Sequence, residues 1–70
     1  MTGDWQMALE EFCSNQGWSM PVYTIKSSTT YHFCKVSVGG EAFRGQISST
    51  CEQARENAAF EAYNRLRVTV

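Results

Sequence analysis

The chain has 70 residues, which is enough for one hydrophobic core and one domain but leaves little room for an enclosed active site. Hydrophobic residues make up 43% and charged residues 19%, which is the composition of a folded globule and not of a disordered tail. The net charge is −1, so global charge gives no affinity for polyanions and any nucleic-acid contact must be local.

The first element expected along the chain is a helix over about residues 5–16. Asp4 can cap its start, because an aspartate oxygen accepts a hydrogen bond from the first unpaired amides of a helix. The apolar residues recur at the spacing of one helix face: Trp5, Ala8, Leu9, Phe12 and Cys13. Gly17 then supplies the left-handed residue that commonly ends a helix.

Three strands follow, at about residues 22–26, 31–38 and 41–47. Pro21 introduces them with an extended connection, since it has no amide proton and disfavours a helical residue before it. Gly39 and Gly40 tolerate positive φ angles and predict a two-residue hairpin between the second and third strands. The sheet is an antiparallel meander if the first strand pairs with the second.

Alternation along the second strand divides its side chains between two faces. His32, Cys34, Val36 and Val38 share one face, and Tyr31, Phe33, Lys35 and Ser37 share the other. The first face is expected to meet the helices, which favours a packed or edge-bound His32 over a ligand. Tyr31 and Phe33 then lie on the outer face, unless Lys35 and the first strand cover them or the register is shifted by one residue.

A second helix is expected over about residues 51–67. Thr50 and Gln53 match a capping box, in which each side chain satisfies a backbone amide of the other residue. The narrow face of this helix is small and apolar: Ala54, Ala58, Ala62 and Leu66, flanked by Ala59 and Tyr63. With both helices on one face of the three-stranded sheet, the sequence predicts a two-layer α+β domain of element order α-β-β-β-α.

Cysteine and histidine usage limits the chemistry that the chain can carry. Cys13, Cys34 and Cys51 are odd in number and widely spaced, which indicates free thiols in a reducing, intracellular compartment. His32 is the one histidine and no Cys-x-x-Cys is present, so no metal and no cofactor are expected. One thiol and one imidazole make no oriented nucleophile–base pair, which favours a binding module over an enzyme.

Two further expectations concern the context of the chain. No run of about 18 apolar residues is present, so no contact with a membrane is expected. The sequence begins just before one helix and ends just after another, which favours a domain taken from a longer chain.

Short motifs accompany this order of elements: Leu9-Glu10-Glu11-Phe12, Gly17, Pro21-Val22-Tyr23, Val36-Ser37-Val38-Gly39-Gly40, and Ala54 followed by Ala58-Ala59. Together they resemble the double-stranded RNA-binding domain (dsRBD) family over nearly the whole chain. Most of the matching positions are those that the fold needs for packing. The resemblance implies a non-catalytic module whose partner is double-stranded RNA, recognised by shape and not by sequence.

The resemblance also implies three places of RNA contact. On the first helix, Glu11 matches the family's outward-facing glutamate, although a pair of solvated glutamates, Glu10 and Glu11, is an equally good interpretation. In the loop after the first strand, the family's Gly-Pro-x-His is missing, and Lys26 is left as an extra phosphate contact.

The third place is the start of the second helix, where the family carries Lys-Lys-x-Ala-Lys after a serine cap. Thr50 keeps the cap and Arg55 keeps the last cation, whereas Cys51 and Glu52 replace the two leading lysines. The hydroxyl groups near this helix start are those of Ser48, Ser49 and Thr50. Losing two lysine contacts predicts binding weaker by roughly tenfold or more at physiological salt.

Protein recognition is the alternative function that keeps the same fold. Its candidate contact residues are Tyr31, Phe33 and Phe60, the last of which lies off the alanine face. The partner would be another protein or a second copy of the chain in a homodimer. RNA binding is favoured by the family resemblance and protein binding by the charges, so both stay open.

Overall fold

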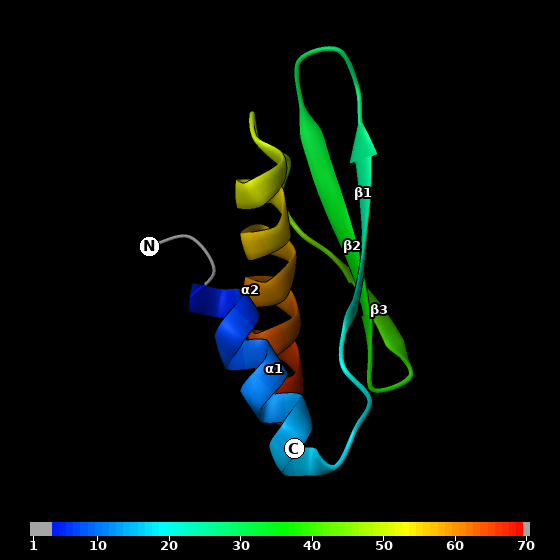
Figure 1. Ribbon diagram of the computed structural model, residues 1–70, viewed down its shortest axis with the longest axis vertical. Coiled ribbons are helices and arrows are strands. Elements are labelled where there is room, and N and C mark those ends of the chain that lie inside the picture. The colour runs from blue at the N-terminus through cyan, green and yellow to red at the C-terminus, as the bar shows by residue number, and fades with distance from the viewer. Residues whose placement is uncertain (1–3, 70) are drawn as a thin grey trace.

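The elements follow one another in the predicted order. The computed structural model describes residues 4–69. Its elements are α1 (Asp4–Gln16), β1 (Val22–Ser27), β2 (His32–Val38), β3 (Glu41–Arg44) and α2 (Cys51–Thr69). The strands form one antiparallel sheet in the order β1-β2-β3, and both helices lie on the same side of it (Figure 1). The predicted two-layer α+β architecture is confirmed.

Glycines set the two sharpest turns. Gly17 has a φ of +74°, and its amide and the next one donate to the carbonyls of Ser14 and Cys13 at 3.1 and 2.9 Å. These two bonds form a Schellman motif, which satisfies carbonyls left unpaired at the end of a helix. Gly39 and Gly40 have φ angles of +58° and +82°, the signs that a type I′ hairpin requires between β2 and β3. Both predicted turns are confirmed.

Strand β3 is shorter than predicted, because it ends at Arg44 and not at residue 47. Gly45 turns the chain toward α2 so closely that a Cβ atom there would lie 2.3 Å from the backbone nitrogen of Ala58. The chain then meets β2 once more, in an isolated bridge between His32 and Ser48. All other bounds lie within two residues of those predicted.

The core lies between the sheet and α2, where small side chains allow a close approach. Its buried apolar residues are Leu9, Cys13, Cys34, Val36, Val38, Ala54, Ala58, Ala59, Ala62 and Leu66. The members from α2 are the predicted alanine face and its closing leucine. The members from β2 are the predicted helix-facing set, so the alternative register, shifted by one residue, is wrong.

Aromatic rings form much of the contact between α1 and α2. The ring centre of Trp5 lies 4.8 Å from the ring centre of Phe60 and 5.7 Å from that of Tyr63. Phe12 lies 5.9 Å from Tyr63 and 5.8 Å from Trp18. The Trp5–Phe60 and Phe12–Tyr63 pairs are edge to face, and pairs of this kind contribute about 0.5–1.5 kcal/mol each beyond their buried area, so they fix α1 on α2.

The start of α1 is held by a side chain that is 50 residues away in sequence. Glu56 of α2 is only 4% exposed. Its carboxylate accepts hydrogen bonds from the amides of Trp5 and Gln6 at 2.9 and 3.2 Å and from the Gln6 side-chain amide at 3.0 Å. The carboxylate thus satisfies first-turn amides that have no partner within α1. Nothing in the local sequence of either helix predicts this contact.

Candidate nucleic-acid interface

The loop between β1 and β2 and the N-terminus of α2 lie at the same end of the molecule (Figure 1). The loop is tight, since the amide of Ser28 donates to the carbonyl of Tyr31 at 2.8 Å. His32 follows directly, and its amide and carbonyl each form a 2.8 Å hydrogen bond with the backbone of Ser48. These bonds hold the loop and the segment before α2 together as one surface.

The first turn of α2 presents hydroxyl groups around its amides. The hydroxyl of Thr50 accepts from the amide of Gln53 at 3.1 Å, so the predicted cap is confirmed. The amide of Thr50 donates to the hydroxyl of Ser48 at 3.4 Å, whereas Gln53 turns away and donates to Asn57 at 3.0 Å. The reciprocal half of the predicted capping box is therefore wrong. Each hydroxyl serves as an acceptor here, which leaves its proton to donate to an anion.

The segment between β3 and α2 is fixed against α2. Besides the close approach at Gly45, the side-chain amide of Asn57 donates to the carbonyl of Gln46 at 3.1 Å. The hydroxyl groups that follow in this segment are therefore presented from a backbone held at both ends.

The charges at the start of α2 nearly cancel. Glu52 is exposed in the first turn, and Arg55, half-buried, follows one turn later. A carboxylate at this position interacts favourably with the helix dipole, but it also competes with any incoming phosphate. The groups at this helix start that can interact with an anion are therefore its amides and hydroxyl protons, with little help from net charge.

His32 joins the two parts of this surface through its side chain as well. Its Nδ1 lies 2.7 Å from the hydroxyl of Ser27 and 3.6 Å from the sulfur of Cys51. The half-buried imidazole is thus edge-bound, as predicted. The proximity of His32 to Cys51 was not predicted, but a single ring nitrogen cannot be fully engaged with both groups, and the shorter contact is the one to Ser27.

Burial favours the protonated form of two thiols and one phenol in and beside the core. It raises the pKa of the Cys13 and Cys34 thiols above their ordinary value of 9.0. It also raises the pKa of the Tyr23 hydroxyl, with a smaller contribution from the charge of Glu10. These groups stay protonated, which suits a scaffold for binding.

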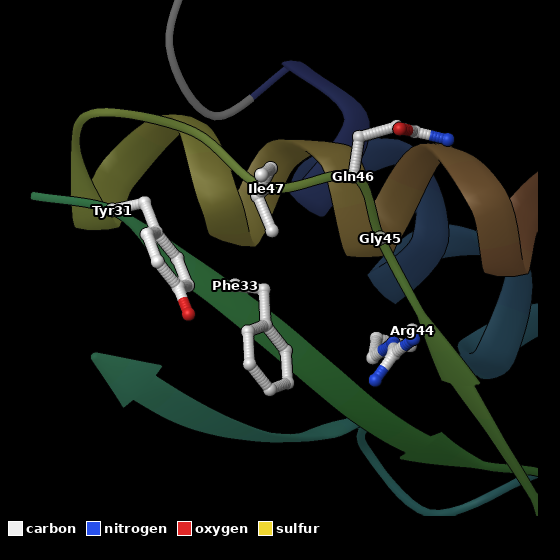
Figure 2. A pocket seen from close by; sticks show the side chains of 6 residues that line it. All are labelled: Tyr31, Phe33, Arg44, Gly45, Gln46 and Ile47. Atoms are coloured by element: carbon white, nitrogen blue, oxygen red, sulfur yellow. The ribbon is translucent and has the colours of Figure 1, made fainter. Parts of the chain in front are cut away.

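The outer face of the sheet carries a second surface with an open hollow of about 500 Å³ (Figure 2). The residues that line it are Tyr31, Phe33, Arg44, Gly45, Gln46 and Ile47. Tyr31 is 43% exposed, and the guanidinium of Arg44 lies 5.1 Å from the centre of the Phe33 ring. Lys26 is opposite Phe33 in the register and so belongs to this face, away from the start of α2.

The three aromatic residues predicted to contact a protein do not form one surface. Tyr31 and Phe33 lie at the hollow on the outer face of the sheet. Phe60 lies on the helical side, where the ring of Trp5 packs against it and leaves it 44% exposed.

A comparison with protein families identifies the fold. The family model of the double-stranded RNA binding motif matches residues 7–66, from within α1 to near the end of α2. The chain belongs to the double-stranded RNA-binding motif family. It is therefore a dsRBD, a double-stranded RNA-binding module, as its motifs predicted.

Solved structures confirm the dsRBD fold. A mutant dsRBD of human tRNA dihydrouridine synthase (20) matches 89% of this chain with 68% of its own, at 18% identity and a TM-score of 0.83. HYL1 from Arabidopsis matches 93% of this chain with 97% of its own, at 21% identity and a TM-score of 0.80. The second dsRBD of DRB4 matches 90% with 94%, at 21% identity and a TM-score of 0.74. No curated protein matches the chain in sequence.

The residues predicted to contact RNA fall in three places on this dsRBD. Four lie at the start of α2, one on α1 and one on the outer face of the sheet: Ser48, Ser49, Thr50 and Arg55, then Glu11, then Lys26. Prediction from sequence placed His32 as packed or edge-bound but did not show that it connects the loop to the start of α2. His32 pairs with Ser27 across the turn, and this register places its ring between the loop and the start of α2.

No helix among residues 4–69 is both long and apolar enough to span a membrane.

Proposed function

We propose that this dsRBD binds double-stranded RNA weakly, with the start of α2 as its main contact and α1 as a second. The observation that carries the proposal is the α2 N-terminus, where the first amides and the hydroxyls of Ser48, Ser49 and Thr50 share a surface with the β1–β2 loop. Unpaired amides at a helix start bind phosphate. Arg55 adds a cation one turn later.

The exposed α1 residue Glu11 supplies the second contact. α1 lies toward the opposite end of the molecule from the β1–β2 loop (Figure 1), which suits contacts to two successive grooves of one duplex. A carboxylate there accepts hydrogen bonds from ribose hydroxyls or base-edge amines, the groups that a shallow minor groove presents.

The weakness follows from the charges that meet the phosphates. Glu52 places an anion where a cation is needed, and Cys51 supplies no positive charge in the preceding position. Each lost cation means that about one fewer counterion is released on binding, which makes the free energy of binding less favourable. We therefore expect a dissociation constant in the micromolar range or above at physiological salt.

A titration with a labelled RNA duplex of about 20 base pairs tests the proposal, because a dsRBD spans about 16 base pairs. Fluorescence anisotropy between 50 and 200 mM salt should show weak binding that decreases steeply as salt increases. Arg55→Ala should reduce the slope of log K against log salt by about 0.9, the value for one phosphate contact. Absence of any binding at 50 mM salt would refute the proposal.

A matched pair of charge reversals tests the location of the contact. Glu52→Lys at the start of α2 should strengthen duplex binding by about tenfold, since it removes an anion and adds a phosphate contact. Glu61→Lys makes the same change of charge farther along the helix, where Glu61 forms an exposed ion pair with Arg65 at 2.9 Å. Equal strengthening by both variants would show that net charge, and not the start of α2, governs binding.

Protein recognition is the second candidate function, and the pair Trp5 and Phe60 favours it. These rings are 37% and 44% exposed although they pack edge to face, so they form an apolar patch where α1 meets α2. A homodimer through this patch should dissociate in Phe60→Ser when both proteins are compared by sedimentation equilibrium. A wild-type protein that is monomeric at about 100 μM would exclude a dimer tighter than that concentration. The free thiols suit an intracellular location for either function.

A further inference from the structure

The outer face of the sheet concentrates positive charge in a chain whose net charge is negative. Lys26, Lys35 and Arg44 all lie on this face, and they are half of the six lysines and arginines of the chain. The other strand residues described on this face are uncharged: Val22, Thr24, Phe33, Ser37 and Ala42. The outer face of the sheet therefore offers a polyanion three cations, with no competing carboxylate among the strand positions of that face.

The arrangement of these cations is unfavourable without a ligand. Lys35 is directly opposite Arg44 across the β2–β3 ladder, and Lys26 is the diagonal neighbour of Lys35, about 7–8 Å away. Like charges on facing positions destabilise a sheet, and here no acidic residue of the same face separates them. A bound chain of phosphates would relieve this repulsion.

Aromatic rings lie beside the cations. In Figure 2, Tyr31, Phe33 and Ile47 surround the hollow, Arg44 stands at its far side, and the side chain of Gln46 points away. The hollow, at about 500 Å³, is within the range of pockets that hold small ligands. Ile47 is 61% and Tyr31 43% exposed, so both are accessible to a flat ring.

We propose that this outer sheet face binds single-stranded nucleic acid, with bases stacked on Tyr31 and Phe33 in the hollow and phosphates on Lys26, Lys35 and Arg44. Aromatic rings on an open sheet are a platform on which RNA-binding domains stack bases, because every base has a π face. An acidic protein segment would satisfy the cations but would leave the rings without flat partners. The start of α2 lies on another surface, so this proposal does not depend on the binding of duplex RNA.

Anisotropy with a labelled single-stranded RNA of 12 nucleotides tests the proposal. The slope of log K against log salt should be about −2, since each of three phosphate contacts contributes about 0.7 on a single strand. Lys35→Ala should reduce that slope by about 0.7, whereas Lys35→Arg should keep it. Tyr31→Ala should weaken binding by about 5- to 150-fold at every salt concentration, and Tyr31→Phe should not.

Two controls separate this face from net charge and from the duplex site. Arg67→Ala removes one exposed cation from the last turn of α2 and should leave single-strand binding unchanged. Arg55→Ala should weaken binding of a duplex only. Lys35 and Tyr31 are exposed, so their variants should stay folded in urea unfolding, and Lys35→Ala should be at least as stable as the wild type because it removes the repulsion with Arg44.

Three results would overturn the proposal. The first is absence of single-strand binding at 50 mM salt. The second is binding that neither Lys35→Ala nor Tyr31→Ala changes. The third is a labelled poly-glutamate peptide that binds this face in a Lys35-dependent manner while the RNA does not, which would assign the surface to an acidic protein.

Discussion

Removal of the Glu56 carboxylate should destabilise the whole domain, although Glu56 is not one of the apolar core residues. Glu56→Ala leaves the amides of Trp5 and Gln6 and the Gln6 side chain without their acceptor. Loss of a helix cap costs about 1 kcal/mol, loss of the charge at the helix start about 0.3–1, and loss of the side-chain bond about 0.5–1.5. The sum is about 2–3.5 kcal/mol, a large part of the total stability expected for 70 residues.

Thermal unfolding and urea unfolding, each followed by tryptophan fluorescence and circular dichroism, measure this effect. Glu56→Ala should lower the melting temperature by roughly 10–20 °C. Glu56→Gln keeps the shape and one acceptor oxygen, so about 1 kcal/mol of destabilisation is expected. The control is Glu61→Ala, which breaks an exposed ion pair with Arg65 and should cost under about 0.5 kcal/mol. Equal costs for Glu56→Ala and Glu61→Ala would refute the assignment of Glu56 as the cap of α1.

Two further predictions concern the close approach of β3 to α2 and the thiols. Gly45→Ala should destabilise the domain by about 2–3 kcal/mol or more in urea unfolding, because the added Cβ would lie 2.3 Å from the α2 backbone. The control is Gly40→Ala, where the added Cβ has nothing within 4 Å. This variant should cost only about 1–2 kcal/mol, because of the positive φ of Gly40. At pH 8 an alkylating reagent followed by mass spectrometry should modify the half-exposed Cys51 first, since Cys13 and Cys34 are buried and burial raises the pKa of both. As the pH rises above about 9, thiols of the unfolded chain ionise while those of Cys13 and Cys34 in the folded protein stay protonated, so the free energy of unfolding should decrease. Rapid alkylation of all three thiols in the folded protein would contradict the burial on which both thiol predictions depend.

The fold could be predicted from sequence because its signals are local. A glycine with positive φ ends α1, two glycines form the hairpin, and the alanines of α2 repeat at helical spacing. The features that were not predicted depend on contacts between distant segments. Glu56 reaches α1 across 50 residues, and β3 ends early because Gly45 meets the backbone of α2.

The candidate sites show the same division. The cap by Thr50 was predictable because it involves a residue three positions away. The contact between His32 and Cys51 depends on how the sheet meets the start of α2, which no local pattern encodes. The position of Lys26 in the sequence suggested a role near the β1–β2 loop. The register of the sheet places Lys26 on the outer face with Lys35.

The link from Glu56 to α1 also has a consequence for synthesis of the protein. A ribosome that adds about 5–20 residues per second needs roughly 3–10 s to make the 50 residues between Gln6 and Glu56. During that interval the 13 residues of α1 lack the acceptor of their first amides. Isolated helices of this length are marginally stable in water. Trp5 and Phe12 also lack their partners on α2 until then. The nascent domain is thus expected to present an unfolded aromatic α1 segment to chaperones until most of α2 has emerged.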